Sequence, residues 1–361
     1  MSRSCVSYHR VVDRRRTSFQ PSLMPIPPIQ WCTRRAASVI ALSSLVAALA
    51  PVRSFAQRPA PHPSNPALAE LQAALDSVMH KQPIDFTAYS KLTETSRRKV
   101  LELIALDALR TPDDFLVAST LATDPSGFYE SRRLEHELAL VALVMGQPEA
   151  LKRLGLTWDG LNWSMGRGQR IGTYMRNGVA NNMDPVPAPA VIRELFKNPS
   201  AARARAAEAT NNAELQKMRD EDQKDREDPI DQAKMARMDA DDSVHKTRTL
   251  ELLEEGAAKT GRDMHNAATV LQHGDTPDDY RLAHELSIAA IALGDTTALW
   301  LVSRSYDRML LSMGHRQRLN TQYGGAEAKP LPLDTTGVND RIRVALGSRR
   351  LADAGKAPGT R

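Results

Sequence analysis

The sequence predicts an all-α protein made of a duplicated helical-hairpin unit, similar to a repeat or solenoid protein, behind a cleavable signal peptide. Three observations support this prediction. One six-residue pattern occurs twice, apolar residues recur at helical spacing, and alternating strand patterns with turn pairs are nearly absent. The 361 residues suffice for two or three modest domains with a core, and an aromatic share of 5% is common in helical repeat proteins.

The first 56 residues have the features of an export signal. Two arginines precede a small-residue apolar stretch at 36–50, and Ser-Phe-Ala at 54–56 supplies the small residues that signal peptidase requires. We expect cleavage after Ala56, export by the general secretory route rather than the twin-arginine route, and a periplasmic or secreted product. Met24 is an alternative start, and an uncleaved anchor is the alternative to cleavage.

Positive charge and cysteine are concentrated in that N-terminal segment. It carries eight arginines and one aspartate, so its net charge of +7, against +5 for the whole chain, leaves −2 for the remainder. Both cysteines, Cys5 and Cys32, also lie there. After cleavage the chain would contain no cysteine, so we expect neither disulfides nor cysteine-based catalytic or zinc sites. It also loses the main support for nucleic-acid binding, and no membrane span is expected after cleavage.

Two long segments of the chain match at a nearly constant offset. The hexapeptide RLEHEL at 133–138 reappears 148 residues later as RLAHEL at 281–286, and the match continues without a gap to Thr173 and Thr321. Upstream the offset is 149. The sequence therefore predicts a disordered lead-in at 57–65, helical unit 1 at 66–175, a linker and helix at 176–209, helical unit 2 at 210–323, and a tail with one possible helix at 324–361.

Helix ends can be located within these units. Thr111 and Thr276 each precede a proline and two aspartates, the pattern of an N-cap, a first helical residue and an acidic first turn. Asp295 is placed to cap another helix, and Gly294 and Gly314 suit the left-handed residue that follows a helix. The helix after Thr276 is apolar on most faces, so we expect it to be central and buried. Each unit then holds four to five helices packed as antiparallel hairpins.

The second unit resembles an uncharacterised bacterial domain family of unknown function. The shared elements are M-x3-D-Q-x2-R, a Gln-His pair, an Asp-Arg pair, G-x-x-Q-x-Y-G-T-Q and a closing V-x-x-R-x-R. In this chain they fall on Met218, Asp222, Gln223, Arg226, Gln272, His273, Asp307, Arg308, Gly314, Gln317, Thr321, Gln322, Val338, Arg341 and Arg343. The resemblance covers about residues 213–354, with Leu319 and Asn320 where Tyr and Gly are usual. It implies candidate positions but no reaction.

These positions nominate a ligand-binding or catalytic set of polar side chains. Its members are Asp222, Gln223, Arg226, His273, Asp307, Arg308, Gln317, Thr321 and Gln322, with first-unit counterparts Asp159, Gln169 and Thr173. Each has a structural alternative. Asp222 and Arg226 suit a surface ion pair along a helix, and His273 suits a charged cap at a helix end. Asp307 with Arg308 can brace a neighbouring helix, and the Gln317–Gln322 loop can equally serve a ligand or its own backbone.

Other site classes find no support. No nucleotide-binding or nucleophile-elbow motif occurs, and the histidines of the second unit lack metal-binding helical spacing, so neither cofactor nor metal is expected. His136 and His284 are expected to be core histidines that pack the units together. The leading function is a binding or scaffolding module for a small polar ligand, peptide or partner protein, and a homo-oligomer is possible. The alternatives are a hydrolase-like enzyme with His273 or Asp307 as general base and a structural envelope protein.

Overall fold

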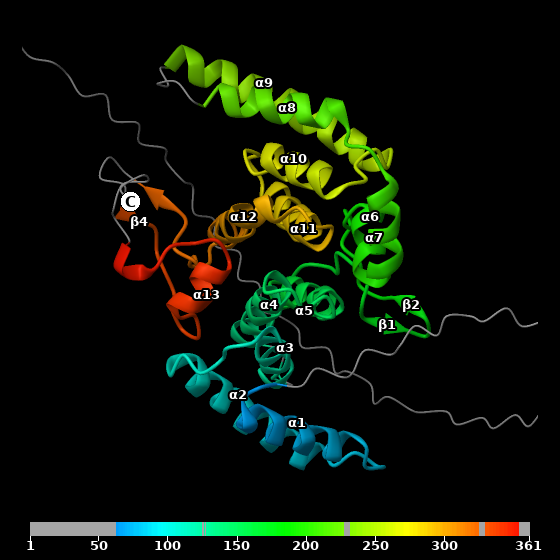
Figure 1. Cartoon of the computed structure of the whole chain (residues 1–361), viewed down its shortest axis with the longest axis vertical. Coiled ribbons are helices and arrows are strands. Elements are labelled where there is room, and N and C mark those ends of the chain that lie inside the picture. Colours follow the sequence, from blue (N-terminus) through cyan, green and yellow to red (C-terminus); the bar gives the residue numbers. More distant parts are fainter. Residues whose placement is uncertain (1–62, 125, 127, 227–231, 325–328, 354–361) are drawn as a thin grey trace, which may run out of the picture. The chain divides into compact units, whose positions relative to one another are not determined.

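The computed structural model describes residues 63–353 apart from 125, 127, 227–231 and 325–328. The predicted export signal, its cleavage site and the alternative start therefore lie outside the described residues. Regular structure in the described part is almost entirely helical, which confirms the predicted all-α class (Figure 1). No helix among these residues has both the length and the apolar character needed to cross a membrane.

The elements fall into two halves that α7 (Pro199–Glu208) connects. The first half, residues 66–197, contains α1 (Pro66–Met79), α2 (Phe86–Ala105), α3 (Pro112–Leu121), α4 (Tyr129–Val144), α5 (Ala150–Ser164), β1 (Met175–Arg176), β2 (Val179–Ala180) and α6 (Ala190–Lys197). The second half, residues 213–353, contains α8 (Ala213–Lys224), α9 (Gln232–Glu254), α10 (Gly261–Leu271), α11 (Pro277–Ala292), the 3-10 turn η1 (Thr296–Ala298), α12 (Leu299–Ser312), β3 (Tyr323–Gly324), β4 (Lys329–Pro330), α13 (Asp340–Ala345) and the 3-10 turn η2 (Leu351–Asp353). Each pair of strands forms a short antiparallel hairpin.

The helix ends lie where the local sequence predicts them. The side chain of Thr111 accepts a hydrogen bond from the backbone of the third helical residue of α3, and Thr276 does the same for α11, each in a reciprocal capping box. Asp295 caps η1. Gly294 and Gly314 have φ of +99° and +81°, the left-handed conformation that residues with a Cβ rarely adopt.

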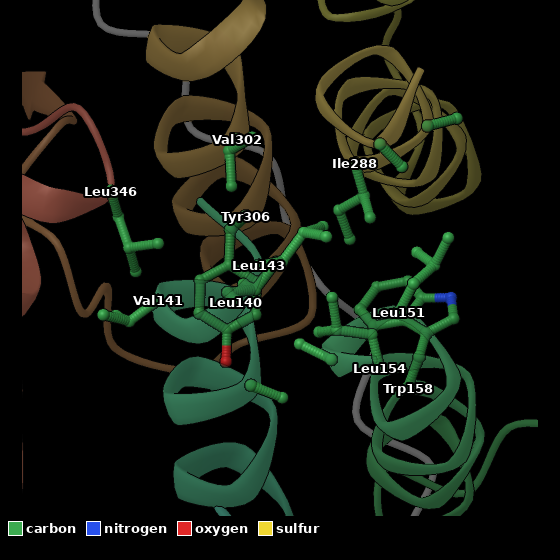
Figure 2. Packing of buried hydrophobic residues seen from close by; sticks show 14 of the residues in the cluster. Leu140, Val141, Leu143, Leu151, Leu154, Trp158, Ile288, Val302, Tyr306 and Leu346 are labelled. Carbon is green, nitrogen blue, oxygen red and sulfur yellow. The ribbon is translucent and has the colours of Figure 1, made fainter. Parts of the chain in front are cut away.

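Apolar side chains of both halves meet where α4 and α5 pack against α11 and α12. Figure 2 shows Leu140 and Trp158 from the first half facing Ile288 and Tyr306 from the second, and each of these four side chains is almost completely buried. Buried residues occupy most positions of α11, as its apolar sequence predicts. The junction between the halves is therefore part of one continuous core.

Two buried ion pairs cross this junction at equivalent positions. The carboxylate of Glu285 on α11 accepts hydrogen bonds from Arg170 Nε at 2.7 Å and Nη2 at 2.8 Å. The carboxylate of Glu137 on α4, 148 residues earlier, accepts the same two bonds from Arg318 at 2.7 and 2.8 Å. Each half thus provides a glutamate for the arginine of the other, and both pairs are bidentate.

Between these pairs, two buried histidines meet ring to ring. His136 Nε2 lies 3.1 Å from His284 Nε2. His284 Nδ1 lies 3.0 Å from the carbonyl oxygen of Val302, to which it can only donate, so its Nε2 accepts the proton of His136. His136 Nδ1 then accepts from the hydroxyl of Thr157 at 3.2 Å. Burial lowers the pKa of both imidazoles, that of His284 to about 3, so the pair is neutral.

The segment 176–209 is packed against the helices, which corrects the prediction of a linker with one helix. Its α6 buries Ile192 against the core, and α6 contacts both α5 and α11. Before α6, the carboxylate of Asp184 accepts two hydrogen bonds at 3.1 Å from the buried guanidinium of Arg281 in the second half. The Asn and Pro residues that suggested a linker give this segment an irregular backbone, and contacts with distant residues hold that backbone in place.

The first described residues differ from the prediction. Ser64, expected in the disordered lead-in at 57–65, donates to the carboxylate of Asp114 at 2.9 Å, so the end of that range is anchored on α3. The tail from residue 324 contains a helix as expected, α13, which ends shortly before Gly347, whose φ is +77°. A hairpin and α13 therefore belong to the packed second half.

Candidate functional site

The predicted site residues separate into two groups, one of which supports a loop. Asp307 is fully buried on α12. Its carboxylate accepts hydrogen bonds from the backbone N–H groups of Arg318 at 2.7 Å, Leu319 at 3.0 Å and Thr321 at 3.0 Å, and from the Thr321 hydroxyl at 2.8 Å. Burial raises the pKa of Asp307, and these hydrogen bonds oppose the rise. The carboxylate has no free face for a ligand.

Gln317 completes this loop support. Its amide nitrogen donates to the carbonyl oxygens of Gln322 at 2.9 Å and Leu331 at 2.8 Å, and its amide oxygen accepts from the backbone of Gln322 at 2.9 Å. Buried backbone groups need such partners. Of the two roles that the sequence left open for the loop, the contacts of Asp307 and Gln317 favour backbone support.

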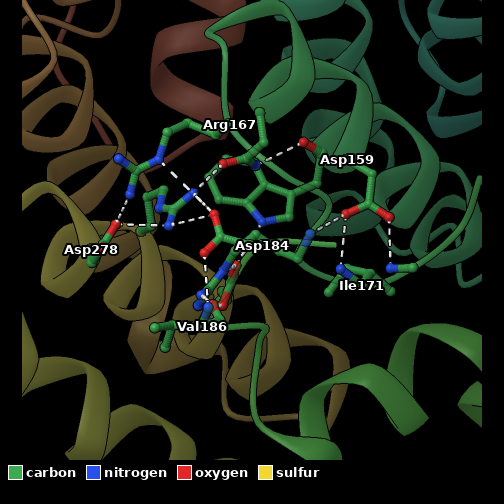
Figure 3. Close-up of polar contacts among 12 residues, drawn as sticks. Asp159, Arg167, Ile171, Asp184, Val186 and Asp278 are labelled. Carbon is green, nitrogen blue, oxygen red and sulfur yellow. Dashed lines mark hydrogen bonds and ion pairs between the residues drawn. The ribbon is translucent and has the colours of Figure 1, made fainter. Parts of the chain in front are cut away.

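The first-unit counterparts make the same contacts. Asp159 accepts backbone hydrogen bonds from Arg170, Ile171, Gly172 and Thr173 at 2.7 to 2.9 Å, and one from the Thr173 hydroxyl at 2.8 Å (Figure 3). The amide of Gln169 bonds both backbone groups of Tyr174. Asp159, Gln169 and Thr173 are therefore the loop support of the first half.

The second group lies where α8 meets the end of α10. Asp222 on α8 is only 2% exposed, and its carboxylate accepts from Arg226 at 2.8 Å and from the amide of Gln223 at 2.6 Å. Arg226 also donates to Asp242 on α9 at 2.6 Å. His273 Nε2 lies 3.8 Å from Asp222 Oδ2, beyond hydrogen-bond distance. The predicted surface ion pair of Asp222 and Arg226 is therefore corrected: the pair forms, but its carboxylate is buried because α9 and the end of α10 cover it.

Burial makes the titration of this group unusual. It raises the pKa of Asp222 to about 6, although the charge of Arg226 opposes the rise. It also lowers the pKa of His273 to about 3, and the positive charges of Arg226, Arg308 and Arg304 act in the same direction. His273 is thus a neutral imidazole near pH 7. The predicted role as a charged helix cap is wrong because three guanidiniums and burial disfavour the imidazolium.

Arg308 connects the two groups. Although adjacent to Asp307 on α12, it does not contact the same partners: Arg308 Nε donates to Gln322 Oε1 at 3.2 Å, and a terminal nitrogen donates to the carbonyl oxygen of Gln272. Gln322 in turn donates to the Thr321 hydroxyl at 3.0 Å. Asp222, Arg226, His273, Arg308 and Gln322 therefore form one partly exposed polar cluster, which we call the His273 cluster.

Sequence reasoning missed two charged residues of this region. Arg304 lies one helical turn before Arg308 and stacks on the ring of Trp300 at 4.9 Å, and Asp242 binds Arg226. Helical spacing of Arg304 and Arg308 was the available signal for the first. No sequence spacing indicates Asp242, because its contact with Arg226 depends on the tertiary packing of α9 against α8.

Comparisons with known proteins add no identity. Among the described residues, no group of three His, Cys, Asp or Glu side chains is placed to hold a metal ion. No protein-family model matches the chain, and no curated protein or solved structure matches it either.

Proposed function

We propose that the chain is an exported binding module, built from two copies of one helical unit, and that its second unit binds an anionic group of a small polar ligand, peptide or partner protein at the His273 cluster. The proposal keeps the binding function that the sequence favours but moves the contact surface. Asp307, Gln317 and Thr321 support the loop, so ligand contacts fall to Arg308, His273 and their neighbour Arg304.

One observation carries this proposal. Within the described chain, neither Arg304 nor Arg308 has a carboxylate partner: Arg304 has only its contact with Trp300, and Arg308 binds two neutral oxygens. Burial lowers the pKa of both guanidiniums. The charge of Arg349 adds to this effect at Arg304, and the charges of Arg304 and Arg226 add to it at Arg308. Partly desolvated arginines without counter-charges are suited to bind a carboxylate or phosphate in bidentate fashion.

The duplication and the export are parts of the same proposal. Matching ion pairs, loop supports and hairpins at an offset of about 148 residues support two copies of one unit.

Export rests on the signal-like features of the first 56 residues. Mass spectrometry of the periplasmic or secreted fraction should find a new N-terminus at Gln57. Intact N-termini on cytosolic protein would refute export.

The binding proposal can be tested by isothermal titration calorimetry with citrate and with a triglutamate peptide, using trilysine as the charge-reversed control. We expect saturable binding of at least one acidic probe and none of trilysine. Arg304→Gln and Arg308→Gln should each weaken binding about tenfold, because each removes charged hydrogen bonds. Arg248→Gln is the matched control, since this surface arginine already pairs with Glu214.

Two results would contradict the binding proposal. One is the absence of binding by both acidic probes. The other is a similar loss of affinity in Arg248→Gln, which would indicate general charge attraction. Melting temperatures of all variants separate loss of binding from loss of fold. Arg304→Gln is the more secure variant, because its guanidinium contacts only the Trp300 ring in the described structure.

A hydrolase-like reaction is the second candidate, and His273 is the residue that favours it. Its imidazole is neutral, and its Nε2 is buried with no hydrogen-bond partner among the described residues. A neutral imidazole can accept a proton as a general base, and a bound substrate that adds negative charge would have to raise its pKa from about 3; Arg308 would then stabilise an oxyanion. Turnover of chromogenic carboxyl and phosphate esters, abolished by His273→Asn, would support this candidate. No turnover by the wild-type protein would eliminate it for these ester classes.

A further inference from the structure

A cavity in the first half lies apart from the His273 cluster. Its volume is about 470 Å³, and α2 lines it together with residues that follow α3. In Figure 1, α2 and α3 lie next to α1, near the blue end of the colour range. This volume lies within the range of small-molecule sites. The lining combines the guanidiniums of Arg97 and Arg98 with apolar Leu101 and Phe128.

Arg97 is the unusual member of this lining. Its Nε is buried and has no hydrogen-bond partner among the described residues. The charge of Arg97 helps to lower the pKa of Asp124, yet the two side chains form no ion pair. Asp124 instead accepts hydrogen bonds from the backbone of Ser126 at 2.9 Å and from the Ser131 hydroxyl at 3.3 Å. The cation therefore retains unused donors beside a cavity, which is costly unless a ligand or water fills them.

The equivalent position in the second half carries a cation that has a counter-charge. Lys246 stands 149 residues after Arg97, and its amine binds the carboxylate of Asp279 at 2.7 Å. Asp279 stands 148 residues after Ser131, so the first half has a hydroxyl where the second has the counter-charge. The fold can therefore hold a cation together with its counter-charge at this position, as Lys246 and Asp279 show. The unsatisfied Arg97 is a particular feature of the first half.

The remaining lining defines the ligand. Phe128 is 64% exposed and lies at the cavity with Leu101, so both can offer apolar surface to a ligand. Glu94, an exposed residue of the lining, forms no ion pair with Arg98 one turn later, within the described residues. The cavity therefore presents two guanidiniums, an apolar wall and two carboxylates, those of Glu94 and Asp124. Glu94 and Asp124 balance the two arginines, which disfavours ligands with several negative charges.

We propose that this cavity is a second binding site, specific for a small molecule that carries a single carboxylate on an apolar body. The carboxylate accepts hydrogen bonds from Arg97, the body contacts Leu101 and Phe128, and a positively charged group on the ligand can meet Glu94. This site is independent of the function proposed for the His273 cluster, because the two share no residue.

Three probes with the same phenyl body test the charge requirement on the full processed chain. They are 3-phenylpropionate, phenylalanine and phenethylamine, titrated at millimolar concentration and followed by ligand-observed NMR and calorimetry. We expect the two carboxylates to bind and phenethylamine not to bind. Tighter binding of phenylalanine than of phenylpropionate would place its ammonium at Glu94. Failure of both carboxylates to bind, or equal binding of phenethylamine, would overturn the proposal.

Variants then locate the bound carboxylate. Arg97→Gln should weaken phenylpropionate binding by about tenfold or more, because a buried charged hydrogen bond is lost. Lys99→Gln is the matched control on the same helix, since Lys99 does not line the cavity and pairs with Glu102. Arg308→Gln should leave phenylpropionate binding unchanged, which separates this site from the His273 cluster. Equal loss in Arg97→Gln and Lys99→Gln would overturn the assignment.

Discussion

The crossed ion pairs predict that the two halves unfold together and that removal of a single carboxylate is costly. In Glu285→Ala, the guanidinium of Arg170 loses both charged hydrogen bonds, at 2.7 and 2.8 Å, and the Trp158 indole loses its acceptor at 2.7 Å. The side chains of Arg170 and Glu285 are 2% and 0% exposed, so water cannot replace the lost partner.

The expected magnitude follows from this burial. Breaking a buried pair from one side costs about 3–5 kcal/mol, because an uncompensated charge remains in the core. For a chain of this size, such a loss lowers the melting temperature by about 10 °C. Replacing both partners, as in Arg170→Met with Glu285→Met, should recover much of the loss, since no unpaired charge remains.

Urea and thermal denaturation measured by circular dichroism test this prediction. Glu137→Ala should behave like Glu285→Ala, because Arg318 holds it in the same bidentate geometry. Arg248→Ala, which breaks surface ion pairs with Glu214 on α8 and Glu251 on α9, is the control and should produce no measurable shift. A cost for Glu285→Ala no larger than that of the control would refute the reasoning. Two separate unfolding transitions would refute the coupling of the halves.

Two further predictions concern the buried polar groups. Asp307→Ala should lower the free energy of unfolding in urea by about 3 kcal/mol, because it leaves several buried N–H groups without an acceptor. The control Asp275→Ala, at an exposed position, should lower it little. Loss of citrate binding by Asp307→Ala at unchanged stability would instead make Asp307 a ligand contact. Burial lowers the pKa of His284 from 6.5 to about 3, so the unfolded chain takes up a proton that the folded chain resists. The neutral His284 therefore makes its full contribution to the free energy of unfolding above pH 6.5. This free energy falls by up to about 1.4 kcal/mol per pH unit as the pH falls towards 3. Denaturation at pH 7 and pH 5 should show a steeper loss for the wild type than for His284→Gln, and equal slopes would contradict a buried neutral pair.

The candidate site could be predicted only in part. The sequence located the helix stop at Gly314 and left two roles open for the Gln317–Gln322 loop, and the structure shows that this loop turns back onto Asp307. It could not show that the carboxylate of Asp307 is occupied by backbone N–H groups of the loop and by the Thr321 hydroxyl. The neutral state of His273 was also beyond local reasoning, since it depends on Arg226, Arg304 and Arg308 from separate elements.

The sequence by itself determined the helical class and the ends of the main helices. Caps such as Thr111 and Thr276, and stops such as Gly294, act on hydrogen bonds within a few residues, so local chemistry suffices. Only the tertiary structure decided that the segment at 176–209 is packed and that each half provides the counter-charge for the other. Glu137 and Arg318 are 181 residues apart, and no spacing rule reveals such a pair. It forms because burying the junction removes both charges from water, so that each charge must find a partner within the protein.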